Sequence, residues 1–398
     1  MRVLLTSNAS YVPPRGGSTH SNLVWLRHLA GQGHECRVVA AAEHDTPARD
    51  ITVNSTRFFS LPETAARVSA LYEQITEWQP DWVLVSSEDL GHALLREASR
   101  SAPGRVVWLA HTPQFFPFGP ESWHQDPAAA RLLHSAAAIV VISHTVADYV
   151  AQHLGRSAKV IHPPIYGAGP WPLMANRQGA VTMINPCTVK GLPIFLALAD
   201  RFPAIRFHAL RGWGTTAADE AALARRANVT LVAAVRDIEE QLAATRILLM
   251  PSLWFEGFGL IVTEAMLRGI PVIASDAGGL VEAKLGTGFA VPVRAITAWE
   301  QTFDDRHMPV AITPPQDIDA WAAALHSLLT DEPLYRRESA AQRDAAMRFV
   351  QALDAGDLLR LLTRLPPPEP RSAPPRLTAA KLSDAQRALV LRKLRERA

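Results

Sequence analysis

Short apolar runs alternate with helix-like stretches along the first 165 residues. The runs are almost continuously apolar, as expected for parallel strands that are covered on both faces. They lie at 3–5, 36–42, 82–86, 106–110 and 139–142. Stretches with helical periodicity separate them, for example at 21–32 and 64–77. The alternation of strand and helix predicts a doubly wound α/β domain over residues 1–165.

The alternation pauses near residue 165 and then restarts. Clusters of proline and glycine at 161–164 and 167–170 mark the pause. New apolar runs follow at 180–184, 206–209, 230–232, 247–250 and 272–274. They predict a second doubly wound domain over residues 166–345, so that two Rossmann-like domains face each other across a cleft. Because ligands bind beyond the carboxyl ends of the strands in open α/β sheets, we expect the chemistry there.

Composition and charge narrow the choice of partners. Forty Lys and Arg residues stand against 38 Asp and Glu residues, so charge gives no reason to expect nucleic acid or a membrane surface as partner. Cys36 and Cys187 are too few for a disulfide framework, and we expect free, half-buried thiols. No run approaches the roughly 20 apolar residues of a membrane span. The first residues predict a strand and not a signal peptide, so the expected location is the cytoplasm.

One segment, 251–265, has the pattern of an anion site. A buried strand ends at residue 250, a loop with Gly257 and Gly259 follows, and a helix is predicted from near Phe258. The first N–H groups of a helix lack internal partners and favour anions. The glycines allow a ligand to approach the main chain closely. The segment therefore predicts a phosphate site.

Two carboxylates flank this predicted helix start. Glu256 comes just before it, and Glu264 follows eight residues later, about 12 Å along a helix. This separation is too large for the carboxylate pair of a retaining hydrolase, which needs about 5 Å. It suits a nucleotide sugar, with Glu256 accepting hydrogen bonds from the sugar and Glu264 from the ribose. The alternative is a solvated helix with two ordinary surface glutamates.

Glu256 and Glu264 resemble the E-x7-E motif of retaining GT-B glycosyltransferases of family 4, also called group 1. Residues 265–276, with Gly278 and Gly279, are also similar to that family. The resemblance extends over residues 1–350. It implies the GT-B fold, in which a nucleotide diphosphate-sugar binds in the cleft between the two Rossmann-like domains, with no cofactor and no metal. It also implies that the donor contacts Gly257, Phe258, Gly259 and Leu260.

The resemblance gives three residues of the second domain a role at the donor diphosphate. Lys190, followed by Gly191, matches the lysine that neutralises the diphosphate. Five residues earlier the family usually has arginine, whereas this chain has Asn185, which can donate a hydrogen bond but has no charge. Arg211, after the next strand, is a candidate to compensate. Val235 matches the position where the main chain meets the nucleobase.

The first domain carries the remaining matches. Gly16 and Gly17 correspond to the family's glycine-rich loop, which closes over the diphosphate and faces the acceptor. His111, at the end of a predicted strand, matches the histidine near the reacting sugar. Three aromatic residues of the following stretch either line an apolar acceptor pocket or pack between loop and core, namely Phe115, Phe116 and Trp123.

The expected reaction is hexose transfer to an acceptor hydroxyl, with Glu256, Lys190 and His111 as the catalytic residues. No carboxylate nucleophile of the first domain is evident opposite Glu256. We therefore expect retention through front-face departure and an oxocarbenium-like state, with the leaving phosphate accepting the acceptor's proton. Two alternatives remain: a nucleotide-sugar epimerase or hydrolase on the same fold, and a catalytically inactive scaffold subunit that binds nucleotide.

The C-terminal part of the chain has a separate organisation. Helical patterns continue through a segment at 346–365, a proline-rich linker follows at 366–375, and a basic helical tail ends the sequence at 376–398. The tail resembles linker segments beside carrier and condensation domains of nonribosomal peptide assembly lines. It is either a solvated basic helix or a docking element for a biosynthetic partner. Docking would make the acceptor a peptide or polyketide natural product.

Overall fold

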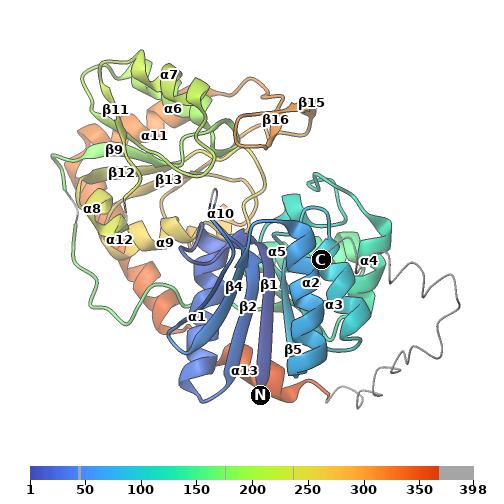
Figure 1. Cartoon of the computed structure of the whole chain (residues 1–398). Helices are drawn as coiled ribbons and strands as arrows, with labels where there is room; N and C mark the ends of the chain where they lie inside the picture. Colours follow the sequence, from blue (N-terminus) through green and yellow to red (C-terminus); the bar gives the residue numbers. More distant parts are fainter. Residues whose placement is uncertain (44–45, 175, 236, 367–398) are drawn as a thin grey trace, which may run out of the picture. The chain divides into compact units, whose positions relative to one another are not determined.

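The computed structural model describes residues 1–43, 46–174, 176–235 and 237–366. The predicted tail, and all of the predicted linker except Pro366, therefore lie outside the described residues. Met1–Leu365 form one compact unit, which contains two large sheets (Figure 1). The prediction of two doubly wound α/β domains is thereby confirmed.

The first sheet has the strand order β3-β4-β2-β1-β5-β6-β7-β8. All neighbouring strands are parallel except β3 and β4. The apolar residues of β1 alternate between two buried clusters, with Val3 and Leu5 in one and Leu4 in the other. The sheet is thus covered on both faces. Its strands are β1 (Arg2–Ser10), β2 (Glu35–Ala41), β3 (Arg49–Val53), β4 (Thr56–Leu61), β5 (Trp82–Ser86), β6 (Val106–Ala110), β7 (Ala138–Val141) and β8 (Lys159–Val160).

Helices connect and cover these strands. They are α1 (Gly17–Gly31), α2 (Thr64–Glu73), which continues as a π-helical turn at Gln74–Trp78, α3 (Ala93–Ser101), α4 (Pro127–His134) and α5 (His144–Leu154). A short 3-10 helix, η2, covers Pro113–Phe115. No strand or helix lies between β8 and the next strand at Ala180 among the described residues, and the predicted boundary at residue 165 falls in this stretch.

The second sheet is fully parallel, in the order β11-β10-β9-β12-β13-β14. Its strands are β9 (Ala180–Ile184), β10 (Phe207–Leu210), β11 (Val229–Val232), β12 (Thr245–Met250), β13 (Val272–Ser275) and β14 (Phe289–Val291). Its helices are η3 (Thr188–Lys190, 3-10), α6 (Leu192–Arg201), α7 (Ala217–Ala224), α8 (Ile238–Ala243), α9 (Leu260–Leu267), α10 (Leu280–Ala283), α11 (Ile318–Thr330) and α12 (Glu332–Gln351).

A separate antiparallel hairpin, β15 (Trp299–Phe303) and β16 (Pro309–Ala311), follows the second sheet. The apolar pattern did not predict it, because most of β15 is polar and exposed. The β3–β4 hairpin was missed for the same reason, since β3 is largely exposed.

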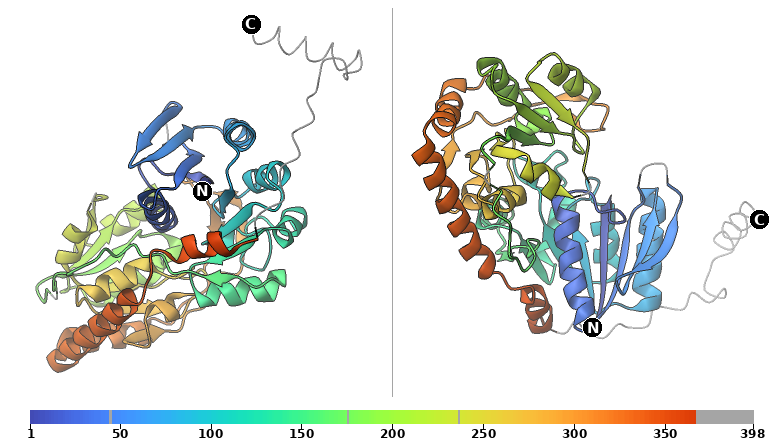
Figure 2. Two further views of the ribbon diagram at one scale, coloured as in Figure 1. Left: turned by 90° about the horizontal axis from the view of Figure 1, so that it is seen from below. Right: turned by 90° about the vertical axis from the view of Figure 1, so that its left-hand side faces the viewer.

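The last helix returns to the first domain. Leu358 and Leu362 of α13 (Asp357–Arg364) belong to the same buried cluster as Trp25 and Leu26 of α1. Both views of Figure 2 show α13, in red, beside the first sheet, after α12 has followed the second domain. The two domains therefore share part of one apolar core.

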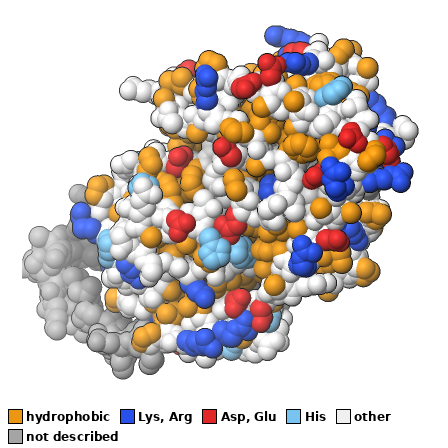
Figure 3. All heavy atoms as spheres, turned by 180° about the vertical axis from the view of Figure 1, so that it is seen from behind, with side chains coloured by type: hydrophobic (Ala, Val, Ile, Leu, Met, Phe, Trp, Pro, Cys, Tyr) orange, Lys and Arg blue, Asp and Glu red, His pale blue; other side chains and the backbone are white. Residues whose placement is uncertain are grey.

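The face shown in Figure 3 carries positive and negative side chains interspersed with apolar ones. Within the described ranges, none of the helices has both the length and the apolar character needed to cross a bilayer.

Candidate active site

Glu256 lies in the loop after β12, and its side chain is only 9% exposed. Its Oε1 atom accepts hydrogen bonds from Lys190 Nζ at 2.6 Å, Ser252 Oγ at 2.5 Å and Trp254 Nε1 at 2.8 Å. Three donors on one oxygen fix the orientation of the carboxylate. The described residues provide no partner for Oε2, which leaves that oxygen available to a ligand.

Lys190 ends η3, directly beyond the carboxyl end of β9. Gly191 has φ 87°, and a Cβ there would lie 1.9 Å from the carbonyl oxygen of Pro251. Only glycine therefore lets this turn approach the loop that carries Glu256. The ammonium also lies 4.6 Å from the ring centroid of Trp254, a cation–π distance.

Asn185 occupies the end of β9 with φ 57° and is buried. Its Oδ1 accepts a hydrogen bond from the Gly214 N–H at 2.8 Å, which fixes the orientation of the amide. Its Nδ2 is buried without a partner among the described residues. Leaving a buried donor unpaired is costly, so this amide is suited to receive an oxygen atom of a ligand.

Arg211 lies beyond β10, as predicted, but its guanidinium is held by Glu220. Nε and Nη2 donate to the two carboxylate oxygens at 2.7 and 2.9 Å. The charge of Arg211 is therefore balanced locally on α7. Its proposed compensation for Asn185 stays a prediction.

The predicted glycines Gly17 and Gly257 lie where the two domains approach each other, near the start of α9. The helix begins at Leu260, with Gly259 as its N-cap. A Cβ on Gly17 would lie 2.9 Å from Leu260 Cδ1. A Cβ on Gly257 would lie 2.1 Å from the carbonyl oxygen of His111. The structure thus brings the glycine-rich loop and the end of β6 against the predicted phosphate site.

Two neighbouring residues contribute mainly through their backbone. Gly16 is the N-cap of α1, with φ 86°. Phe258 is 1% exposed, and its ring stacks on Phe349 at a centroid distance of 5.7 Å. Only the main chain of Phe258 is therefore available for the predicted donor contact.

Glu264 lies on α9 and is partly buried. The described residues provide no hydrogen-bond partner for its carboxylate, and burial raises its pKa to about 7. A carboxylate that is desolvated without compensation is destabilising. The position therefore favours a ligand that donates hydrogen bonds. Val235, predicted near the nucleobase, lies partly exposed in the loop after β11.

His111 is buried at the end of β6 and takes part in a polar network. Asn22 Nδ2 donates to the Tyr11 hydroxyl at 2.8 Å and to Ser86 Oγ at 3.2 Å, so Asn22 Oδ1 is the atom that faces His111 Nε2 at 2.9 Å. Nε2 must then carry the proton. Nδ1 is an unpartnered acceptor among the described residues. Burial lowers the pKa of His111, which favours the neutral ring.

The acceptor-side aromatic residues separate into two groups. Phe115 and Trp123 contact each other, and Trp123 also contacts Trp254 and Trp299 of the second domain, with centroid distances of 5.4 to 5.9 Å. Phe116 instead is fully buried in the core of the first domain. Its contacts with Trp108 and Phe118 agree with the packing alternative, and its place on the acceptor side stays a prediction.

Several residues that orient the predicted ones were not predicted from the sequence. Ser252 and Trp254 precede Glu256 at alternate positions, and that alternation was the available signal. Asn22 lies on the buried side of α1 next to the buried Ser21. Polar residues at buried helix positions were the signal there.

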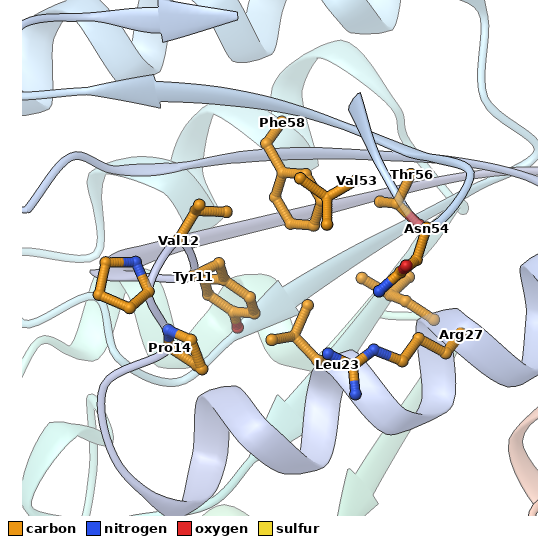
Figure 4. A pocket seen from close by; sticks show the side chains of 11 residues that line it. Tyr11, Val12, Pro14, Leu23, Arg27, Val53, Asn54, Thr56 and Phe58 are labelled. Atoms are coloured by element: carbon orange, nitrogen blue, oxygen red, sulfur yellow. The ribbon is translucent and has the colours of Figure 1, made fainter. Parts of the chain in front are cut away.

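Two cavities lie near these residues. One of about 140 Å³ lies beside the loop before α1 and is lined by Tyr11, Pro14, Leu23 and Phe58, among others (Figure 4). The other cavity, of about 260 Å³, is lined by Thr188, Val189 and residues 308–311, among others. Neither is lined by Glu256, Lys190 or Glu264, so neither defines the candidate site.

Two family models match the chain. The model described as Glycosyltransferase Family 4 matches residues 15–166. The model described as Glycosyl transferases group 1 matches residues 181–331. The first of these matches covers most of the first sheet, and the second covers most of the second sheet.

Individual proteins are similar to this chain only over a short segment or at low sequence identity. A D-inositol 3-phosphate glycosyltransferase of Stackebrandtia nassauensis is 32% identical over 123 residues, which make up 31% of this chain and only 23% of that relative. Sucrose-phosphate synthase from Thermosynechococcus elongatus matches with TM-score 0.70 and 16% identity over 92% of this chain and 98% of that chain. Anabaena HepE in complex with UDP-glucose matches with TM-score 0.63 and 17% identity over 91% and 98%. At these identities the solved structures show a shared fold.

Proposed function

Because the chain belongs to the group 1 glycosyltransferases of family 4 type, with the GT-B fold, we propose that it transfers a hexose from a nucleotide diphosphate-sugar to an acceptor hydroxyl with retention. The observation that supports this most directly is the Lys190–Glu256 pair beside the start of α9. An ammonium, an oriented carboxylate and free helix N–H groups lie together there. This combination suits a sugar joined to a diphosphate.

In the proposed complex the diphosphate binds at the start of α9. The N–H groups between Gly257 and Leu260 and the Lys190 ammonium supply positive potential. Asn185 Nδ2 supplies a neutral donor in place of the family's arginine. These groups stabilise negative charge as the bond between the sugar C1 and the phosphate oxygen breaks. Because they supply that potential themselves, we propose that transfer needs no metal ion at the diphosphate.

The sugar and the ribose are placed by carboxylates and by His111. Glu256 Oε2 accepts hydrogen bonds from sugar hydroxyls, and His111 Nδ1 accepts another. Glu264 accepts hydrogen bonds from the ribose. The acceptor oxygen attacks C1 from the face that the phosphate leaves, and its proton passes to the departing phosphate oxygen. The protein mainly positions both partners and stabilises the leaving group.

The acceptor site is proposed beside Phe115 and Trp123. Trp123 contacts Trp254 and Trp299 of the second domain, so this aromatic pair lies next to the loop that carries Glu256. Such a surface suits an acceptor with an apolar face, such as a peptide or polyketide natural product. The name of the Stackebrandtia relative suggests a different candidate, D-inositol 3-phosphate.

The test uses the full chain with UDP-, ADP-, GDP- and dTDP-hexoses, with and without EDTA. Each donor is supplied without acceptor, with D-inositol 3-phosphate, or with an aromatic peptide or polyketide acceptor. Proton NMR of the product identifies the anomer. A glycoside with the donor's configuration, formed equally in EDTA, supports the proposal. An inverted product, or transfer that is lost in EDTA and restored by Mg²⁺, refutes the mechanism. An isomerised sugar identifies an epimerase, and nucleotide binding without turnover of any donor identifies an inactive scaffold.

A further inference from the structure

Three residues that the proposed reaction does not use lie together in the first domain. They are His92, His124 and Asp126, and one potential ligand atom from each lies within 4.8 Å of the others. His92 is 2% exposed, in a left-handed conformation just before α3. Asp126 is the buried N-cap of α4, and His124 is exposed two residues before it.

Both ring nitrogens of His92 face hydrogen-bond acceptors. Nε2 lies 3.3 Å from the carbonyl oxygen of Phe115, and Nδ1 lies 3.5 Å from Asp126 Oδ2. A neutral imidazole has a single N–H, and the contact with Phe115 uses it. The lone pair on Nδ1 is then buried, without a hydrogen-bond partner among the described residues, and faces a carboxylate. With the proton on Nε2, these two acceptors face each other, and a second proton on the ring or a cation between them would remove their repulsion.

The position of His124 favours a cation. Its ring stacks on that of His92 at 5.7 Å with an interplanar angle of 24°. A second proton on His92 would not require this neighbour. Two imidazoles and a carboxylate form the type of three-residue set that holds zinc, with water as the fourth ligand. We propose that His92 Nδ1, His124 and Asp126 bind a divalent transition-metal ion of the zinc class.

The hydrogen bonds of Asp126 and His92 provide the outer shell of this site. Asp126 Oδ1 accepts from the N–H groups of Ala128 and Ala129 at 3.1 and 3.0 Å, which leaves Oδ2 for the metal. The Phe115 carbonyl fixes the His92 tautomer that presents Nδ1, as second-shell acceptors do for metal-binding histidines. Arg96, which also donates to Asp126 Oδ2, competes with the cation. Its side chain is 44% exposed and can turn into solvent.

The metal would stabilise the loop that carries the acceptor-side aromatics. It joins the turn before α3 to the end of the 113–126 segment, with His124 next to Trp123 in sequence. Trp123 contacts Trp254 and Trp299 across the domains. The ion therefore acts on loop order and not at the diphosphate, so the site does not depend on the proposed transferase function.

The full chain, freed of any affinity tag and dialysed against EDTA, is titrated with Zn²⁺ by calorimetry. Co²⁺ substitution is followed through its visible ligand-field bands. We expect one equivalent of Zn²⁺, a cobalt spectrum typical of four-coordination, and a higher unfolding temperature with Zn²⁺. His124→Ala, at an exposed position, should weaken binding at least tenfold. Arg96→Gln should tighten it several-fold by removing the competing charge.

His134→Ala, at another exposed histidine of the same region, is the matched control and should bind Zn²⁺ like the wild type. Equal Zn²⁺ affinity in His124→Ala and the wild type would overturn the proposal, because binding would then come from other histidines. Absence of stoichiometric binding would also overturn it.

Discussion

Lys190 Nζ donates a hydrogen bond to Glu256 Oε1 over 2.6 Å, and this contact joins the turn after β9 to the loop after β12. When no nucleotide sugar is bound, the ammonium of Lys190 and the carboxylate of Glu256 balance each other's charge in a nearly buried position. An ammonium has three N–H donors, so Lys190 can keep this hydrogen bond and also bind a phosphate oxygen. The pair therefore holds both residues in the positions that the proposed complex needs.

Glu256→Gln removes the charge of this carboxylate but keeps its size. We expect the transfer rate to fall by at least about 100-fold, as when one preorganised electrostatic group is removed, and the free energy of unfolding to fall by about 1–2 kcal/mol, because the Lys190 ammonium loses its charged partner. Lys190→Met should lower the rate similarly. It should also lower the free energy of unfolding by about 2 kcal/mol, because the buried carboxylate loses a charged partner. Rate assays and urea titrations measure both quantities, and wild-type turnover in either variant contradicts the assignment.

Glu264 makes a prediction about stability and pH. Its pKa is raised to about 7 by burial, so the ionised form destabilises the folded state. This loss of folding stability begins as pH rises above the pKa that Glu264 has in the unfolded chain. It is complete once pH exceeds the pKa that Glu264 has in the folded protein. Glu264→Gln should therefore raise the free energy of unfolding by about 1 kcal/mol near pH 8, and by nothing near pH 4.

The same substitution should weaken nucleotide binding. The carboxylate accepts hydrogen bonds from two ribose hydroxyls, whereas the protonated acid accepts them less well. In the wild type, the affinity for the nucleoside diphosphate should rise between about pH 6 and about pH 8. The rise should be smaller in Glu264→Gln, because only the phosphate and other groups titrate in that variant. Calorimetry at each pH measures the difference. Parallel pH profiles in the two proteins would remove Glu264 from the ribose site.

The sequence predicted the sheets well, because most of their strands are buried on both faces and therefore form continuous apolar runs. The two hairpins have strands that face solvent, and their polar residues gave no such signal. Trp299, which contacts the acceptor-side Trp123, lies on one of these hairpins. Part of the candidate acceptor surface therefore could not be predicted from buried apolar runs.

The donor side was predictable where the backbone sets the chemistry. A loop with Gly257 and Gly259 before a helix specifies an anion site regardless of side-chain packing. Side-chain partners were not predictable. Neither the pairing of Arg211 with Glu220 nor the burial of Phe116 follows from local sequence, because both depend on how separate elements pack.

Asn185 makes a prediction about the diphosphate. Asn185→Asp keeps the oxygen that accepts from Gly214 but replaces the unpartnered Nδ2 with a second, negatively charged oxygen. Repulsion of the phosphates should weaken nucleoside diphosphate binding by about tenfold or more. The corresponding nucleoside should bind both proteins equally, which is the internal control in the same calorimetric assay. Equal loss for nucleoside and diphosphate would show that the substitution disturbs the loop and not the charge.

Glu282 of α10 makes a prediction about the contact between the domains. It accepts hydrogen bonds from the N–H groups of His144 and Thr145 at the start of α5, and His162 Nε2 lies 2.9 Å from it. Burial alone would raise its pKa, but the bonds from His162 and from these N–H groups outweigh burial and leave the pKa below its usual range.

A carboxylate whose pKa is lower in the folded protein than in the unfolded chain stabilises the fold. This stabilisation is fully present above the pKa of the unfolded chain and is lost as pH falls through the pKa of the folded protein. Glu282→Gln should therefore lower the free energy of unfolding by about 1–2 kcal/mol near pH 7, and the difference should shrink as pH falls through the lowered pKa of the folded carboxylate. Urea titrations over this range test the prediction. A deficit that stays constant with pH would assign the loss to packing instead of charge.

Gly257 and Gly17 test whether the two domains must meet at the start of α9. A Cβ on Gly257 would lie 2.1 Å from a backbone oxygen of His111, which cannot move without shifting β6. Gly257→Ala should therefore cost about 2–3 kcal/mol of folding stability and reduce transfer by at least about 100-fold, since reacting groups displaced by about an ångström lose that much. A Cβ on Gly17 would meet only Leu260 Cδ1, the end of a flexible side chain. Gly17→Ala is therefore the matched control, and we expect it to fold like the wild type with a much smaller loss of rate. Equal activities in the two variants would show that the approach of His111 to the helix start is not needed for transfer.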